Sequence, residues 1–349
     1  MSLVVVLDLP NSCPCGIDLY SFNCTPQFRG FKSVPDGIHL FYCSSGNEIA
    51  GRCGVWFEAR QDSIHGYRWD GGADLLVPIG QDDLLRMRAS SEIVMYTSPY
   101  PSQANDNMDW PGLTEHVSVS LLSQVLGNQW LVWSDMATLE DPVHEDANTL
   151  RLTEIDLRKS WEDNSTPDQV TFHALDKSWA LEQILKKSHH GKGIPLVGEV
   201  QFCFIMLLFL ANHAGLESWK RILILLCSCR EAILTRPKLY GETIKSLRLQ
   251  LNFCPEDLFS DLITSESFLL PSLRMLRRHL HDVSSDSSVM MEYNALKNTI
   301  LQRFDVDLDL SVAHGVVEIP AEDGGGFQHY ERDDPDEETG EYAPAIVYS

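Results

Sequence analysis

The chain has 349 residues, a length that favours two domains of roughly 100–200 residues each. Apolar residues make up 44% of it and charged residues 22%, a globular composition that excludes a largely disordered chain, a collagen-like chain and a coiled-coil rod. The net charge of −23, from 27 basic and 50 acidic side chains, argues against binding to nucleic-acid phosphates or to anionic membranes.

The cysteines and the N-terminus indicate an intracellular protein. Nine cysteines are an odd number in a chain too long to need disulfides for stability. The apolar stretch 3–7 has five residues before Asp8, which is too short for a signal peptide. We therefore expect reduced cysteines and a cytoplasmic protein, and shuttling to the nucleus stays open.

Residues 1–135 have the pattern of a β-rich domain. Short β-branched and aromatic segments between Gly, Pro, Asn and Asp predict strands at 3–9, 37–43, 54–60 and 66–70. A short helix is expected over 114–125, with Thr114 as its N-cap. This domain is predicted to be a sandwich or a distorted barrel.

Residues 136–171 differ in charge from their neighbours and are predicted to be an acidic linker. Ten acidic and three basic residues lie between 135 and 168, with few periodic apolar positions. One strand is expected near 150–157.

Residues 172–315 show helical periodicity and predict an all-α domain, so the fold class is α+β with two domains. Pro195 opens a helix whose apolar run, 202–211, is too short for a membrane span and predicts a core helix. Pro255 is expected to start another helix. The remaining stripes are Leu175, Trp179, Ile184 and Leu185; Trp219, Ile222, Leu223, Leu226 and Ile233; and Val289, Tyr293, Leu296, Ile300 and Phe304.

Residues 316–349 form a tail with ten acidic residues and one basic residue. Such a composition favours disorder in the free protein. Two apolar pieces could instead add a strand to a partner's sheet, and the two readings are compatible. The residues of these pieces are Val316, Val317 and Ile319, then Ala345, Ile346 and Val347.

No motif in the chain marks a catalytic, cofactor or metal site. The C-x-C pairs at Cys13 and Cys15 and at Cys227 and Cys229 lack zinc-ribbon spacing, and the second pair is predicted to lie mid-helix. Phosphate-binding loops and nucleophile elbows are also missing from the sequence. We expect a protein that is not an enzyme and binds no metal or cofactor.

Two polar clusters could contact or regulate a partner. Arg274, Arg277 and Arg278 form either a solvated basic face or a docking surface for an acidic protein or for the chain's own tail, and RNA is the third candidate because the acidic tail and linker would compete with it. The serines before the last predicted helix form either a linker with an N-cap or a phosphorylation switch. They are Ser284, Ser285, Ser287 and Ser288.

Several separated motifs occur in an order that resembles one known family. They are Gly16-Ile17-Asp18, Phe28-Arg29, Pro35-x-Gly37-Ile38-His39, Gly198-Glu199-Val200-Gln201-Phe202 and Trp219-Lys220-Arg221. This collinear pattern, over about 4–320, is similar to that of the AAR2 family of U5 small nuclear ribonucleoprotein assembly factors.

The resemblance implies a β-rich N-terminal domain, a linker and a helical superhelix of the VHS type. It also implies an assembly chaperone that binds the large spliceosomal scaffold, pre-mRNA-processing-splicing factor eight, at its RNase H-like and Jab1/MPN-like domains, and that blocks premature helicase and RNA engagement. Gly16, Ile17, Asp18, Phe28 and Arg29 are then candidate partner contacts, and the tail could complete a partner's sheet.

A VHS-type adaptor in membrane traffic is the alternative, although it leaves the β-rich domain unexplained. For the chaperone we expect a monomer when free, with no membrane binding and no direct nucleic-acid binding.

Overall fold

The computed structural model describes residues 2–44, 51–101, 109–138, 149–158, 160–255, 258 and 268–309. The chain divides into two compact units. The first contains Met1–Thr153 and Lys192–Lys220, and the second contains Glu154–Gly191 and Arg221–Ser349. The domain boundaries expected near 135 and 171 stay predictions.

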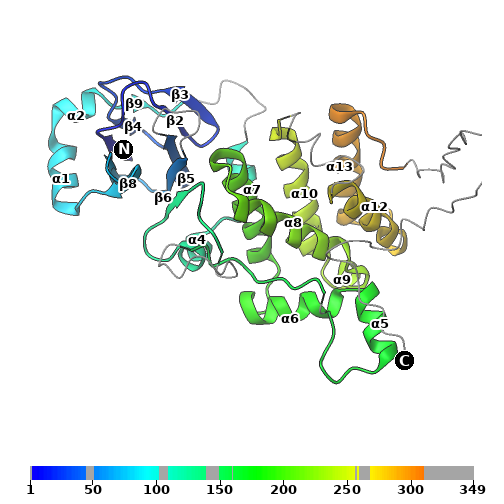
Figure 1. The fold of residues 1–349 in the computed structure, drawn as a ribbon. Helices are drawn as coiled ribbons and strands as arrows, with labels where there is room; N and C mark the ends of the chain where they lie inside the picture. The colour runs from blue at the N-terminus through cyan, green and yellow to red at the C-terminus, as the bar shows by residue number, and fades with distance from the viewer. Residues whose placement is uncertain are drawn as a thin grey trace, which may run out of the picture. The chain divides into compact units, whose positions relative to one another are not determined.

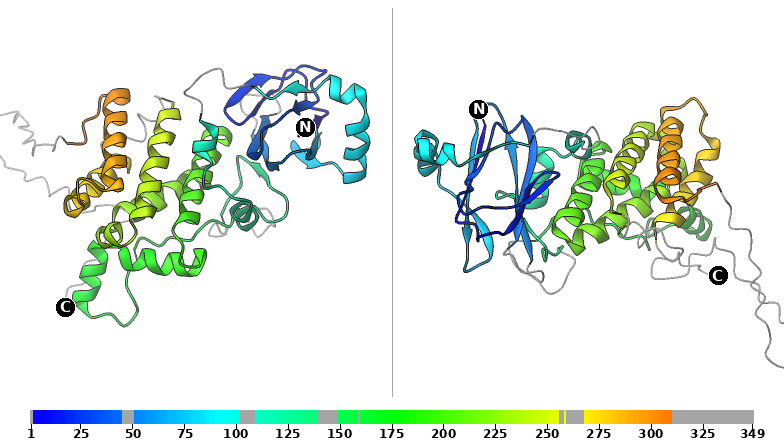
Figure 2. Two further views of the ribbon diagram at one scale, coloured as in Figure 1. Left: turned by 180° about the vertical axis from the view of Figure 1, so that it is seen from behind. Right: turned by 90° about the horizontal axis from the view of Figure 1, so that it is seen from above.

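The first unit contains two five-stranded sheets that face each other in Figure 2. One has the order β8-β7-β1-β4-β9 and the other the order β10-β6-β5-β2-β3. The strands are β1 (Leu3–Leu7), β2 (Pro14–Ile17), β3 (Tyr20–Asn23), β4 (Gly30–Lys32), β5 (Gly37–Ser44), β6 (Arg52–Ala59), β7 (Ile64–Asp70), β8 (Leu75–Pro78), β9 (Ser98–Pro99) and β10 (Leu131–Trp133).

A common apolar core holds the two sheets together. It takes Val4, Phe31 and Trp69 from one sheet and Phe41 and Phe57 from the other, which confirms the predicted β-rich sandwich. The continuous apolar sequence of β1 fits its central position between β4 and β7, where most of its side chains are buried. The long strands β5 and β6 pair antiparallel over their whole length.

The short helices of the first unit flank the sheets. They are α1 (Gln81–Ala89), α2 (Ser91–Met95), α3 (Trp110–Leu113) and α4 (Val119–Leu126). The single helix expected over 114–125 is wrong. Thr114 is the C-cap of α3, and Ser118 caps α4 by accepting a hydrogen bond from the Leu121 N–H.

Helix α7 (Ile194–Leu210) belongs to the first unit, together with the start of α8 (His213–Cys227). Pro195 lies in its first turn, as predicted, and twelve of its residues are buried, which confirms a core helix. Phe202 packs on Trp56 of β6 with ring centroids 5.7 Å apart. Within the described ranges, no single helix has the length and apolar character to cross a membrane; the helix Ser178–His189 and α7 meet that test only as a bent pair.

The second unit is helical, and α10 (Pro237–Phe253) lies beside α13 (Ser288–Phe304) in Figure 1. The stripe expected for α13 is confirmed at Val289, Tyr293, Leu296 and Ile300, which are buried, whereas Phe304 is only half-buried. The other helices are α5 (Pro167–Leu175), α6 (Ser178–His189), the end of α8, α9 (Arg230–Thr235), α12 (Leu269–His279) and the short η1 (Leu280–Asp282).

In two places the sequence predicts one continuous helix where the structure has two. The stripe from Leu175 to Leu185 breaks between α5 and α6, and Ile233 belongs to α9 rather than to α8. The carboxylate of Asp176 explains both breaks. It accepts hydrogen bonds from the Ser178 N–H at 3.0 Å and from the Arg230 and Glu231 N–H groups at 3.1 and 3.0 Å. One side chain therefore satisfies the starts of two helices.

Two further expectations meet the structure differently. The strand near 150–157 is wrong, because the described stretch 149–158 contains only an isolated bridge between Leu150 and Thr138. The helix expected from Pro255 falls largely outside the described residues, and α10, which starts at Pro237, was not predicted.

Candidate partner-binding site

The first family motif folds into a buried polar group around Asp18. Asp18 follows β2 with φ 54°, a left-handed conformation that Asp tolerates, and it is 0% exposed. Its Oδ1 accepts a hydrogen bond from the Leu40 N–H at 2.9 Å, and its Oδ2 accepts one from the Tyr100 hydroxyl at 2.7 Å. His39 Nδ1 lies 2.6 Å from the same Oδ2. The motifs containing Asp18 and His39 are thus brought into direct contact.

His39 lies between two oxygen acceptors. Its Nε2 lies 2.9 Å from the carbonyl oxygen of Pro35, and its Nδ1 faces the Asp18 carboxyl group. Loss of Asp18 would leave the His39 Nδ1 buried without this partner, which is costly.

Gly16 of the same motif lies within strand β2 and is tightly packed, so it is not a turn residue. A Cβ on Gly16 would lie 2.3 Å from the Tyr42 ring, so only glycine fits in β2 here. Ile17 is 0% exposed. Gly16, Ile17 and Asp18 therefore do not face solvent, and their contact with a partner stays a prediction.

Phe28 and Arg29 have different surroundings. Phe28 is buried in a cluster of edge-to-face rings, 5.5 Å from Phe22 and 5.3 Å from Phe31 between centroids. Arg29 is half-buried and donates from Nη1 to the carbonyl oxygens of Pro26 and Phe28, both at 2.9 Å. Arg29 also lines a hollow of about 220 Å³. Its other lining residues are Gln27, Ile93 and Tyr96.

The second family motif fastens α7 to two loops of the first unit. Glu199 accepts hydrogen bonds from the Thr153 N–H at 2.6 Å and from the Thr153 hydroxyl at 2.8 Å. Burial raises the pKa of Glu199 to about 7, and the two bonds from Thr153 oppose that rise. Gln201 Oε1 accepts from the His116 N–H at 2.8 Å, and a Cβ on Gly198 would lie 2.2 Å from the His116 carbonyl oxygen.

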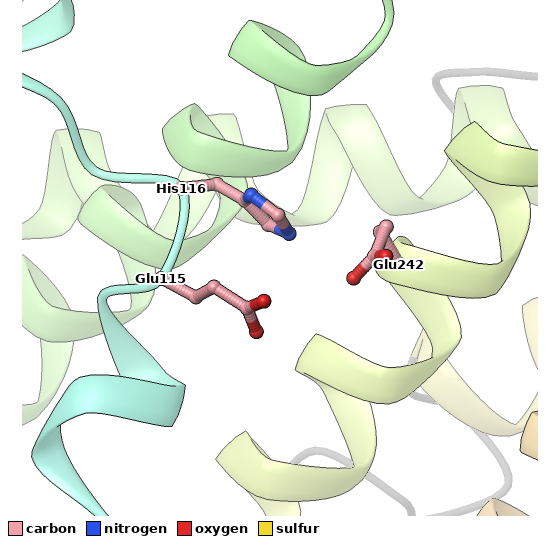
Figure 3. A group of neighbouring side chains, drawn as sticks. All are labelled: Glu115, His116 and Glu242. Carbon is pink, nitrogen blue, oxygen red and sulfur yellow. The ribbon is translucent and has the colours of Figure 1, made fainter.

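Sequence reasoning treated this helix only as apolar core. Glu199 and Gln201, which lie just before the apolar run 202–211, were the available signal, because buried polar groups are normally hydrogen-bonded. Figure 3 shows Glu115 and His116 in the loop before α4, and Glu242 on α10. Glu242 belongs to the other unit, so we assign no metal site to these three residues.

In the helical unit, Arg277 of α12 and Lys297 of α13 hold Asp309, the last residue that the structure describes. Arg277 Nε lies 2.9 Å from Asp309 Oδ1, and Lys297 Nζ of α13 lies 2.7 Å from Asp309 Oδ2. Arg277 Nη1 also donates to the carbonyl oxygens of Leu308 and Asp309, both at 3.2 Å. Leu308 is 0% exposed. We call this arrangement of Arg277, Lys297 and Asp309 the tail clasp.

The hydrogen bond from Lys297 lowers the pKa of Asp309; burial opposes this, and the charge of Arg277 adds to the lowering. Of the other basic residues of the cluster, Arg274 is half-buried and Arg278 is exposed. The tail pieces Val316, Val317 and Ile319, and Ala345, Ile346 and Val347, lie outside the described residues.

The serine segment ends at the N-terminus of α13. Ser287 is the N-cap, and its hydroxyl oxygen accepts from the Met290 N–H at 3.2 Å. Ser284, Ser285 and Ser288 are exposed, while Ser287 is half-buried. The predicted N-cap is confirmed, and phosphorylation stays a prediction.

The two C-x-C pairs differ from each other. Cys227 ends α8 and Cys229 is the N-cap of α9, so the prediction that this pair lies mid-helix is wrong. Cys229 Sγ donates to the Leu225 carbonyl oxygen at 3.0 Å and is buried. Cys13 and Cys15 lie in the sandwich core with three other thiols.

Taken together, these features define a two-domain α+β protein with a β-sandwich unit and a helical unit, in which Arg277 holds Asp309, the last residue that the structure describes. Two family models match the chain: the AAR2 N-terminal domain over 1–127 and the AAR2 C-terminal repeat region over 152–309. The chain belongs to the AAR2 family.

Similar proteins span most of the chain. It is 27% identical to the human protein AAR2 homolog over 360 aligned positions, covering 91% of this chain and 93% of the human one. It is 24% identical to the Caenorhabditis elegans protein AAR2 homolog, covering 80% and 87%. It is 25% identical to the A1 cistron-splicing factor AAR2 of Saccharomyces cerevisiae, covering 76% and 81%. None of these names describes an enzymatic activity.

Proposed function

We propose that this protein acts in pre-mRNA splicing as a non-enzymatic assembly chaperone of the U5 small nuclear ribonucleoprotein. Membership of the AAR2 family and similarity to a yeast protein named as a splicing factor support the role. In this proposal the helical unit is a VHS-like superhelix, and the protein is cytoplasmic with access to the nucleus.

The proposed partner is the large U5 scaffold protein, bound through its RNase H-like and Jab1/MPN-like domains. The tail clasp is the observation that carries this proposal. Because Arg277 and Lys297 fix Asp309 on the helical unit, everything from residue 310 onward starts from a defined point. Residues 310–349 could span at most roughly 130 Å if fully extended. The apolar pieces within that reach suit strand addition to a partner's sheet.

Charge supplies the second part of the proposal. Scaffold surfaces that contact RNA are expected to be positive, and this chain carries −23 overall, with ten acidic residues and one basic residue in 316–349. Complementary charge mainly speeds encounter and favours the correct partner. Occupation of these surfaces would exclude helicase and RNA by competition.

The test is size-exclusion chromatography of the protein with the scaffold's two domains. Full-length protein is compared with a form ending at Gly315, and with a matched full-length variant whose acids between 331 and 341 are changed to amides. We expect a complex that weakens on truncation and at higher salt, with the amide variant losing most of the salt dependence. Absence of a complex with every form would refute the proposed partner. Binding unaffected by truncation would move the interface to the folded units.

A further inference from the structure

Five of the nine cysteines gather in the core of the β-sandwich. Cys15 of β2 lies directly opposite Cys43 of β5, which lies directly opposite Cys53 of β6. Cys13 and Cys24 flank the β2–β3 hairpin, one position beyond its last paired residues, Pro14 and Asn23. All five thiols are free.

The Cys13 and Cys24 thiols are in contact. Their Sγ atoms lie 3.2 Å apart, and the Cys24 N–H donates to the Cys13 carbonyl oxygen at 3.0 Å. Opposite residues in an antiparallel pair have Cα atoms about 4.5–5.5 Å apart, which lies inside the range that a disulfide spans. Little backbone movement is therefore needed to join these two sulfurs.

Cys43 and Cys53 form a second close pair of thiols, with which the pair of Cys13 and Cys24 can be compared. Its Sγ atoms are 3.7 Å apart, and the two residues lie inside the long β5–β6 ladder. Contact with Cys53 and burial raise the pKa of Cys43, so it is held as a thiol. A protonated thiol in a packed core is a poor nucleophile.

Cys13 and Cys24 differ because they lie just beneath the surface. Each is buried, but the residues on both sides of each one are exposed. These neighbours are Ser12, Pro14, Asn23 and Thr25. Hydrogen bonding from Cys15 lowers the pKa of Cys13 to about 7, so much of it is thiolate near neutral pH. Burial and the contact with Cys13 raise the pKa of Cys24 to about 11.

We propose that Cys13 and Cys24 form a redox-active dithiol that hydrogen peroxide converts into a disulfide. The Cys13 thiolate attacks one peroxide oxygen, the O–O bond breaks, and hydroxide leaves and takes up a proton to form water. Cys13 is then a sulfenic acid. The Cys24 sulfur attacks the Cys13 sulfur, the S–O bond breaks, and the Cys24 proton leaves with the hydroxide as a second water. The two sulfurs lose two electrons in total, and the peroxide gains them.

The disulfide would close the β2–β3 hairpin covalently. This hairpin carries Gly16 and Ile17 and leads into Asp18, so oxidation acts on the segment that contains the first family motif. The inference does not depend on the proposed splicing role.

Mass spectrometry of the full-length protein tests the proposal. Reduced protein is treated with hydrogen peroxide at pH 7, unfolded, alkylated at its remaining thiols and digested. We expect the nine free thiols to fall to seven, with a crosslinked peptide pair joining Cys13 to Cys24. In Cys24→Ser, dimedone should label a sulfenic acid at Cys13 without a disulfide.

Matched variants keep the outcome decisive. Cys43→Ser and Cys254→Ser each remove a buried thiol outside the pair and should oxidise like the wild type. Cys24→Ala is used as well, with circular dichroism, so that a misfolded serine variant does not decide the result. A thiol count that stays at nine, a first disulfide between Cys43 and Cys53, or zinc held by these thiols in the purified protein would overturn the proposal.

Discussion

Glu199 in the middle of α7 accepts both hydrogen bonds that Thr153 donates, from its N–H at 2.6 Å and from its hydroxyl at 2.8 Å. Glu199 is 0% exposed. One buried carboxyl group thus ties the core helix to the end of a segment 46 residues earlier in the chain.

This carboxyl group should make the stability of the protein depend on pH. Burial raises the pKa of Glu199 from 4.5 to about 7 in the folded protein. A raised pKa stabilises the fold fully below pH 4.5, and this contribution is lost as pH rises through about 7. We expect a decrease of roughly 3 kcal/mol in the free energy of unfolding over that range from this group.

The variant Glu199→Gln keeps the shape and removes the titration, so the slope due to this site should vanish. Urea unfolding at pH 4.5, 5.5, 6.5 and 7.5 measures it. The exposed Glu231→Gln serves as the control and should keep the wild-type slope. Equal slopes in wild type and Glu199→Gln would contradict the assignment.

Asp18→Ala should be strongly destabilising. It leaves His39 and the Leu40 N–H buried without their partner, and each buried group left unsatisfied costs about 1–3 kcal/mol. Tyr100→Phe removes only one donor and should cost about 1 kcal/mol. Denaturant midpoints test both variants, with the exposed Asp36→Ala as control. If Asp18→Ala were as stable as Asp36→Ala, the motif would not be a structural core.

Asp309→Asn should loosen the tail clasp without unfolding the helical unit. Asp309 and Arg277 are about 42% and 41% exposed, so their pair contributes little stability, about 0.2–1 kcal/mol. If the clasp positions the tail for a partner, Asp309→Asn removes the stabilisation of this ion pair from the complex. The affinity for the scaffold domains should then fall by at most about fivefold. Titration calorimetry measures the affinity, and Asp307→Asn is the neighbouring control. A much larger loss would mean that Asp309 contacts the partner itself.

The serine segment should respond to charge at the start of α13. Ser287→Ala removes the N-cap and should cost about 1 kcal/mol. Ser288→Asp places a negative charge at the positive end of the helix dipole and should stabilise the protein by about 0.3–1 kcal/mol. Thermal melts compare both with Ser284→Ala, whose side chain is exposed. Destabilisation by Ser288→Asp would argue against a phosphate being accommodated there.

These residues show why features that depend on neighbours in the sequence can be predicted, whereas features that depend on distant residues cannot. The capping role of Ser287 and the helix start at Pro195 depend on neighbours within one turn, so local rules found them. The break after Cys227 was missed because the carboxylate that satisfies the start of α9 belongs to Asp176, 54 residues before Arg230. The break at Asp176 had a local signal, since Asp176 accepts from the Ser178 N–H two residues later. Helix α10 was missed although its signal was present, since Pro237 and a stripe through Tyr240, Ile244 and Leu247 precede Pro255.

The candidate site divides in the same way. The motifs containing Asp18 and His39 were visible in the sequence, but their contact depends on the pairing of β2 with β5. Arg277 was visible as part of a basic cluster, whereas its partner Asp309 lies 32 residues further along the chain.

The sequence by itself determined the two domain classes, the acidity of the tail and the burial of the apolar run in α7, because composition and periodicity reflect the solvent around each segment. Only the tertiary structure decided that α7 packs on Trp56 of the sandwich, that Cys13 meets Cys24, and that Asp309 meets Arg277. An apolar face can be buried against any complementary core. The choice among cores depends on the packing and hydrogen bonds of residues far apart in the chain.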